Sequence, residues 1–158
     1  MIAFSQKEIN LRYQKCFNGS EKIRVGVAVA LINLENKILL EKRNDCGWWG
    51  VTGGKLDLGE TIQECAKREI NEECGLKIQT KDLNLVGVYS NPKEGRILQY
   101  PDNRVHLIDV VYFIKRKFGH LRKSDESLEL KFFPFNALPN LIVPPAVVPI
   151  QDISVIFS

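Results

Sequence analysis

The sequence contains little of what a zinc site requires. Its four cysteines are Cys16, Cys46, Cys65 and Cys74. No two of them form a C-x2-C pair, and the two histidines, His106 and His120, have no spacing relation to them. Zinc sites usually draw their ligands from such closely spaced pairs. The sequence therefore argues against zinc and favours reduced, mostly buried thiols, as expected of a cytoplasmic protein.

Long apolar runs are also absent. No stretch of about 18 apolar residues occurs, and residues 1–10 lack the apolar centre of a secretory signal, so we expect no association with membranes. The formal net charge of +3 falls short of the bias expected of a dedicated nucleic-acid binder. It is compatible with anionic small molecules, so we expect a small-molecule partner and not a nucleic acid.

The chain of 158 residues has a length typical of one domain, and its composition, 44% hydrophobic and 26% charged, is that of a globular protein. No internal repeat or interdomain linker is evident. We therefore expect a single domain over residues 1–158, with residues 1–20 as an N-terminal extension. Ser5 and Glu8 have capping-box spacing, which predicts a short helix over roughly residues 6–15.

Strand-like apolar segments alternate with helical ones along the rest of the chain. Strands are predicted over residues 23–32, 37–42, 83–89, 105–114 and 130–135. A second capping box, Thr61 with Glu64, opens a helix that should end near Gly75, and Pro144 should begin a last helix. Residues 90–104 are expected to form a polar loop, and residues 115–123 a basic hairpin turn. This order predicts an α/β sandwich around a central mixed sheet.

The helix after Thr61 carries an unusual set of charges. On a helical projection, Ile62, Cys65 and Ala66 form an apolar stripe, and the stripe continues into three carboxylates. These are Glu69, Glu72 and Glu73. Carboxylates spaced in this way repel one another, and the negative end of the helix dipole disfavours them further. A solvated acidic surface paired with Lys67 and Arg68 is one interpretation, and a site for a hard divalent cation is the other.

The segment before this helix favours the cation site. Residues 51–60 contain three glycines and several charges, including Gly53, Gly54 and Lys55. Glycines let the backbone approach a ligand closely. Such a loop can offer carbonyl oxygens to a metal ion and amide groups to phosphate oxygens.

The same residues match a family pattern. Read as G-x5-E-x7-R-E-U-x-E-E-x-G-U, where U is bulky and apolar, the segment resembles the Nudix box at every defined position. These positions are Gly54, Glu60, Arg68, Glu69, Ile70, Glu72, Glu73, Gly75 and Leu76. The resemblance implies a Nudix-type α/β/α sandwich with a central mixed β-sheet. It also implies hydrolysis of a nucleoside diphosphate linked to another group.

The resemblance assigns roles to individual residues. Glu69, Glu72 and Glu73 are implied as ligands of Mg²⁺, with Mn²⁺ as the alternative, and a backbone carbonyl of Gly53 or Gly54 as a further ligand. Glu60 and Arg68 are implied as a structural ion pair. Metal ions held by carboxylates neutralise phosphate charge and activate water. Glu72 or Glu73 is the predicted general base, and Glu126 is the alternative.

Substrate contacts are predicted outside the helix. Arg43 follows a strand and offers a planar guanidinium to a phosphate. Lys55 lies in the glycine-rich loop, and one of the adjacent tryptophans, Trp49, is a candidate to stack on a base. Each has a structural alternative: Arg43 as a surface residue and Trp49 as part of the core.

The substrate itself remains open at this point. Nudix enzymes that act on ADP-ribose often carry a proline about sixteen residues after the box, and Pro92 lies at that distance from Leu76. ADP-ribose or a nucleotide sugar is therefore weakly favoured. A nucleoside triphosphate pyrophosphohydrolase and a non-catalytic nucleotide sensor are the alternatives. Related folds often dimerise, so a homodimer is an expectation.

Overall fold

The computed structural model describes residues 20–100 and 103–157, and the helix predicted over residues 6–15 lies outside them. Eight strands are described, with the following bounds: β1 Ser20–Ile32, β2 Lys37–Arg43, β3 Trp49–Gly50, β4 Gly53–Lys55, β5 Asn84–Tyr89, β6 Ile97–Gln99, β7 Asn103–Lys115 and β8 Ser127–Pro134. The helices are α2 Ile62–Cys74 and α3 Pro144–Phe157, with single 3-10 turns η1 Thr80–Asp82, η2 Pro92–Glu94 and η3 Phe135–Ala137.

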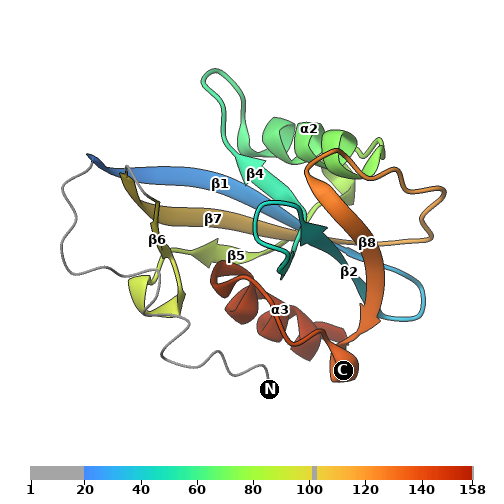
Figure 1. The fold of residues 1–158 in the computed structure, drawn as a ribbon. Coiled ribbons are helices and arrows are strands. Elements are labelled where there is room, and N and C mark those ends of the chain that lie inside the picture. Colours follow the sequence, from blue (N-terminus) through green and yellow to red (C-terminus); the bar gives the residue numbers. More distant parts are fainter. Residues whose placement is uncertain (1–19, 101–102, 158) are drawn as a thin grey trace.

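The strands form one mixed sheet, in the order β3-β2-β1-β7-β5 (Figure 1). The long strands β1 and β7 run parallel, from Ser20 opposite Asn103 to Ile32 opposite Lys115. β1 and β2 pair only at one end, where Ile32 lies opposite Ile38. The two strands therefore diverge, and β4 pairs with the edge of β1 beyond this point. This divergence opens the sheet where the glycine-rich loop enters it.

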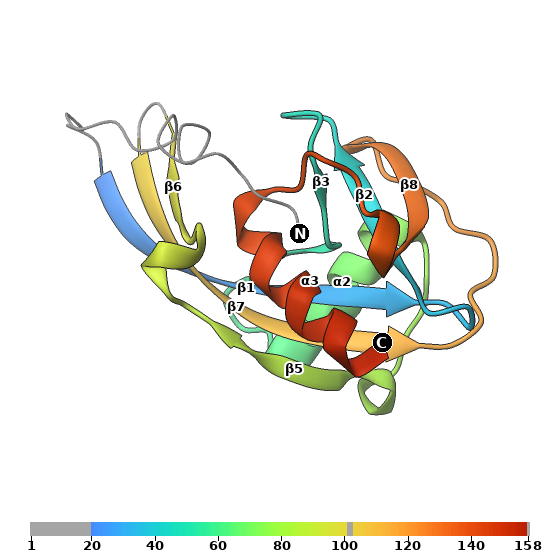
Figure 2. The same ribbon diagram turned by 90° about the horizontal axis from the view of Figure 1, so that it is seen from below.

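Two helices cover the two faces of the sheet (Figure 2). Under α2 lies one apolar core that includes Val29, Leu39 and Ile70. Under α3 lies a second core, with Leu40 and Ile150 among its buried residues. The alternation of side chains along β2 assigns Leu39 to one core and Leu40 to the other. The fold is thus the α/β/α sandwich with a central mixed sheet that the sequence predicts.

Local signals set the ends of α2. The Thr61 hydroxyl accepts a hydrogen bond from the Glu64 N–H, and the Glu64 carboxylate accepts one from the Thr61 N–H. Gly75 ends the helix in the left-handed conformation. Both predicted ends of this helix are confirmed, and so is the helix that begins at Pro144. Within the described part of the chain, no helix is both long and apolar enough to span a membrane.

Two predictions about loops are wrong. Residues 90–104 are not a plain loop, because β6 pairs with β7 there, with Leu98 opposite Val105. Residues 115–123 are not a hairpin turn, because β8 pairs with β2 and not with β7. The segment instead leads from β7 past β1 to β8, which pairs with β2. On the way, Phe118 and Leu121 pack against the core under α2. Long-range strand pairing, which short-range charge patterns do not encode, decides both cases.

Candidate active site

The glycine-rich loop and α2 meet at β4. β4 runs antiparallel to β1, with Val27 opposite Gly54. A Cβ atom built on Gly54 would lie only 2.3 Å from Oε1 of Glu69. A side chain at position 54 would therefore displace the Glu69 carboxylate, and glycine permits this close approach.

The three carboxylates of α2 differ in exposure. Glu73 retains only 7% of its accessible surface and the Glu69 side chain 12%, whereas 58% of the Glu72 side chain is exposed. The prediction that all three extend the inward stripe is wrong for Glu72. The buried face of α2 is centred nearer to Ala66 and Ile70, so Glu72 lies on the outer flank of Glu69.

Glu73 is the most deeply buried of these acids and has an acidic neighbour. Its Oε2 accepts a hydrogen bond from the Gly53 N–H at 2.7 Å. Burial raises the pKa of Glu73 to about 9, with a further contribution from the negative charge of Glu41. Glu41, on β2, is 3% exposed and accepts a hydrogen bond from the Ser127 hydroxyl at 2.5 Å. Burial raises the pKa of Glu41 as well, although the Ser127 hydrogen bond opposes the shift.

Arg68 lies on the outer side of these acids. Its guanidinium donates to both oxygens of Glu60, at 2.6 and 3.1 Å, and to Oε1 of Glu69 at 2.6 Å. It also donates to the carbonyl oxygen of Lys55 at 3.0 Å. The hydrogen bonds from Arg68 lower the pKa of Glu60 to about 2. Arg68 therefore ties the loop to the helix through a bidentate ion pair with Glu60.

Glu41, Glu69 and Glu73, with Glu72 at the rim, are called the acidic cluster below. Burial is the first cause of a raised pKa for Glu41, Glu69 and Glu73, so their ionised forms are costly as they stand. In residues 20–100 and 103–157, no three His, Cys, Asp or Glu side chains converge closely enough to hold a metal ion without adjustment. The donor set nevertheless fits a hard divalent cation, since carboxylate oxygens are its preferred ligands and its charge would offset theirs.

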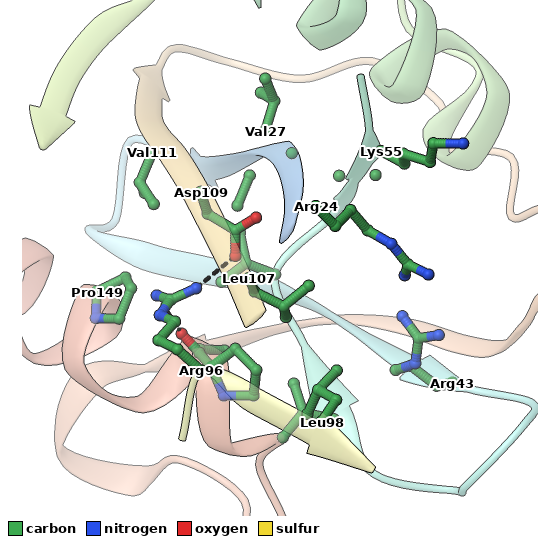
Figure 3. Close-up of a pocket in the computed structure, with 18 of the residues that line it drawn as sticks. Arg24, Val27, Arg43, Lys55, Arg96, Leu98, Leu107, Asp109, Val111 and Pro149 are labelled. Carbon is green, nitrogen blue, oxygen red and sulfur yellow. Dashed lines mark hydrogen bonds and ion pairs between the residues drawn. The ribbon is translucent and has the colours of Figure 1, made fainter. Parts of the chain in front are cut away.

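A pocket of about 390 Å³ adjoins the acidic cluster on the other side of β4. Gly53, Gly54 and Lys55 line it, so the pocket and the cluster share the glycine-rich loop. Cationic side chains Arg24, Arg43 and Lys55 lie on one side of the pocket in Figure 3. Its other walls combine the Arg96–Asp109 ion pair with apolar side chains such as Leu98, Leu107 and Pro149. A volume of this order suits a small organic ligand.

The predicted substrate contacts separate into two groups. Arg43 and Lys55 line the pocket, and the Arg43 guanidinium is held by both oxygens of Asp45, at 2.9 and 3.0 Å. A register shift in the pairing of β2 with β8 occurs between Lys42 and Arg43. Such a bulge re-aims the side chain that follows it.

Trp49 is not among the residues that line the pocket. It packs edge-to-face on Phe133, with ring centroids 4.9 Å apart, and forms part of the core under α3. The prediction that it stacks on a bound base is therefore wrong for this pocket, and its structural alternative holds. Its place on β3, a strand paired with β2, holds it against the core.

Glu126 lies in the loop before β8, beside the acidic cluster. It is exposed, and its backbone carbonyl accepts a hydrogen bond from the Asn44 N–H at 2.8 Å. Its charge is one of the influences that raise the pKa of Glu69 and Glu41. The loop therefore brings a further carboxylate near the cluster.

Sequence reasoning missed three residues of this region. Glu41 has a detectable signal, because it is an acid that directly follows the apolar run of residues 38–40 within a strand. Asp109, a lone acid within the apolar strand β7, carries a signal of the same kind, whereas Arg96, its partner in an ion pair at the pocket, carries none. Their proximity depends on how β6 and β7 pair.

Comparison with known proteins identifies the family. The model of the NUDIX domain matches residues 22–152, which is most of the chain. The chain therefore belongs to the Nudix family. It is 39% identical over 114 residues to an ADP-ribose pyrophosphatase of Methanocaldococcus jannaschii, a match that covers 70% of this chain and 62% of that protein. A putative 8-oxo-dGTP diphosphatase of Bacillus subtilis is 41% identical over 68 residues, covering 43% of this chain and 44% of that protein. The chain thus spans less than two thirds of these relatives.

Solved structures support the fold. A MutT NUDIX hydrolase from Burkholderia pseudomallei is similar with a TM-score of 0.67 and 26% identity, covering 83% of this chain and 98% of that one. The NUDIX domain of Shewanella oneidensis NrtR, solved in complex with ADP ribose, gives a TM-score of 0.69 at 14% identity. The match covers 98% of this chain and 100% of that one. At that identity the second likeness bears on the fold alone.

Proposed function

We propose that this protein is a divalent-metal-dependent pyrophosphohydrolase that cleaves the diphosphate linkage of a nucleoside diphosphate joined to another group. One observation carries the proposal: the acidic cluster and the cation-lined pocket meet at Gly53 and Gly54. A diphosphate needs positive charge on its oxygens and an activated water in line with the leaving group. This arrangement can supply both at one place.

Each residue of the site has a distinct proposed role. Glu69, Glu72 and Glu73 would hold Mg²⁺ or Mn²⁺, with a backbone carbonyl of Gly53 or Gly54 as a further ligand. Bound there, the ion would polarise the phosphate and lower the pKa of water. Arg43 and Lys55 would bind phosphate oxygens from the pocket side. Glu72 or Glu73 would accept the proton of the attacking water, and Glu126 is the alternative base.

ADP-ribose and nucleotide sugars are the favoured substrates. The relative named as an ADP-ribose pyrophosphatase matches over 114 residues, whereas the one named as a putative 8-oxo-dGTP diphosphatase matches over 68. The longer match covers more of the chain outside the box, where substrate contacts lie. Nucleoside triphosphates are the second candidate because the shorter match has the higher identity, 41% against 39%.

A substrate panel with product analysis tests the proposal. ADP-ribose, nucleotide sugars and nucleoside triphosphates would be incubated with Mg²⁺, and the products identified by chromatography. We expect Glu72→Gln and Glu73→Gln each to lower kcat by orders of magnitude while the circular dichroism spectrum is retained. Near-normal turnover in both variants would refute the metal assignment. Tight binding of one nucleotide without any cleavage would instead make the protein a sensor.

A further inference from the structure

Asp109 lines the pocket and lies across it from Arg43 in Figure 3. Burial raises the pKa of its carboxyl, and the charges of Arg96 and Arg24 lower it. Asp109 lies on β7, and its side chain is 19% exposed. A Cβ atom built on Gly26 would lie 2.7 Å from Oδ1 of Asp109 and 2.9 Å from the carbonyl oxygen of Gly54. The carboxylate therefore lies close to the glycine-rich loop, where the pocket adjoins the acidic cluster.

Arg96 holds this carboxylate in place. It is only 1% exposed and pairs through Nη1 with Oδ2 of Asp109 (Figure 3). Its Nη2 donates to the carbonyl oxygen of Pro145 at 2.7 Å, and its guanidinium lies over the ring of Tyr89, 5.5 Å from the centroid. The Tyr89 hydroxyl in turn donates to Asp152 on α3 at 2.7 Å. The guanidinium, fixed by these contacts, orients Asp109, and both of its Nη atoms are already engaged.

The two sides of the pocket therefore favour different chemical groups. Arg24, Arg43 and Lys55 attract the phosphate oxygens. Asp109 offers no donor to a phosphate oxygen, and the charge of Arg96 beside it is already engaged by this ion pair and by the Pro145 carbonyl. A neutral O–H or N–H group would instead find an acceptor there, and a carboxylate accepts such bonds strongly. A substrate that places charge at one side and a neutral donor at the other matches this polarity.

We propose that Asp109, positioned by Arg96, is a specificity residue that binds a neutral hydrogen-bond donor of the substrate. The donor is a hydroxyl of the sugar joined to the diphosphate, a group that a nucleoside triphosphate lacks at that end. This inference deepens the proposed function and rests on it, because it places the diphosphate at the cationic side. It selects a diphosphate joined to a neutral group over a longer phosphate chain.

Binding measurements separate this inference from turnover. Isothermal titration calorimetry would use the full chain with Ca²⁺ in place of Mg²⁺. The probes would be ADP-ribose, analogues that each lack one hydroxyl of the terminal ribose, the hypoxanthine analogue as a control for the base, and ATP. We expect Asp109→Asn to raise the Kd for ADP-ribose roughly tenfold or more, the usual loss for a hydrogen bond to a charged group. The Kd for ATP should change by about threefold or less.

Two further variants keep the result interpretable. Asp109→Asn leaves Arg96 buried without its partner, so the double variant Asp109→Leu with Arg96→Met removes the whole pair and should show the same selective loss. Asp152→Asn alters the same network at its exposed end and should leave the Kd for both ligands unchanged. It is therefore the matched control for a general disturbance of α3.

The analogues identify the donor. The analogue that lacks it should bind the wild-type protein and Asp109→Asn equally well. Loss of selectivity with one of these deoxy analogues assigns the hydroxyl, whereas loss with the hypoxanthine analogue would overturn the inference, because ATP carries the same base. Equal weakening of ADP-ribose and ATP would overturn the inference, as would failure of the wild-type protein to bind ADP-ribose. Binding with this selectivity but no hydrolysis under Mg²⁺ would refute only the proposed enzymatic function.

Discussion

Glu73 is a buried acid whose ionisation the fold opposes, so Glu73→Gln should stabilise the metal-free protein at neutral pH. Its pKa is raised from 4.5 to about 9, first by burial and then by Glu41. Between these values the folded state binds a proton that the unfolded state has released. Stability therefore falls as pH rises through this window, by about 1.4 kcal/mol per pH unit. At pH 7 the cost of this one group is on the order of 3 kcal/mol.

Glutamine is neutral and of similar shape, and its carbonyl can still accept the hydrogen bond from the Gly53 N–H. Glu73→Gln should therefore avoid most of this loss of stability. Its unfolding free energy should also lose the dependence on pH that Glu73 causes. The assay is urea denaturation in EDTA at several values between pH 5 and pH 8.5. The difference in unfolding free energy between Glu73→Gln and the wild type should grow steadily across that range.

Glu72→Gln is the matched control, because it makes the same chemical change on the same helix at a side chain that is 58% exposed. Glu72→Gln should leave the slope of the unfolding free energy against pH close to that of the wild type. Saturating Mg²⁺ should flatten the slope of the wild type, since a bound cation favours the ionised carboxylates. A pH-independent difference for Glu73→Gln, or an equal effect of Glu72→Gln, would refute the reasoning.

Three substitutions around α2 make further predictions. Gly54→Ala places a Cβ against the Glu69 carboxylate and should weaken Mg²⁺ binding measured by calorimetry; Gly119→Ala, with no atom within 4 Å of its Cβ, should not. Thr61→Ala removes the capping hydroxyl and should cost about 1 kcal/mol in urea denaturation while kcat is retained. Arg68→Lys cannot keep the bidentate pair and should lower both Tm and kcat. An unchanged Mg²⁺ affinity for Gly54→Ala, an unchanged unfolding free energy for Thr61→Ala, or an unchanged Tm and kcat for Arg68→Lys would each contradict the role given to that residue.

The parts of the site that the sequence predicts are those with local signals. Thr61 with Glu64 and then Gly75 mark the two ends of α2, because capping depends on residues only a few positions apart. The close approach of Gly54 to Glu69 is also encoded within one short segment. The family pattern covers this same segment.

The pocket could not be predicted in the same way. Asp109 meets Arg96 only because β6 folds back along β7, and the expected loop over residues 90–104 contains no sign of that pairing. The sequence leaves Trp49 as a candidate either for stacking on a base or for the core, and the choice depends on its position beside Phe133, which is set by strands distant in sequence. Such contacts follow from register, and a change of one residue in register would exchange the two faces of a strand.

Glu41 connects these two kinds of information. It shares a face of β2 with Leu39, whose side chain lies in the core under α2. Once that face is known, Glu41 must lie beneath the acidic end of the helix, and its charge does raise the pKa of Glu73. A structural ion-pair network would place a cation between two such acids. Arg68 instead pairs with Asp57, Glu60, Glu69 and Glu72, and none of the ion pairs in the described part of the chain includes Glu41 or Glu73. Ionising Glu41 and Glu73 therefore requires more positive charge than Arg43 supplies, and the divalent ion of the proposed function would provide it.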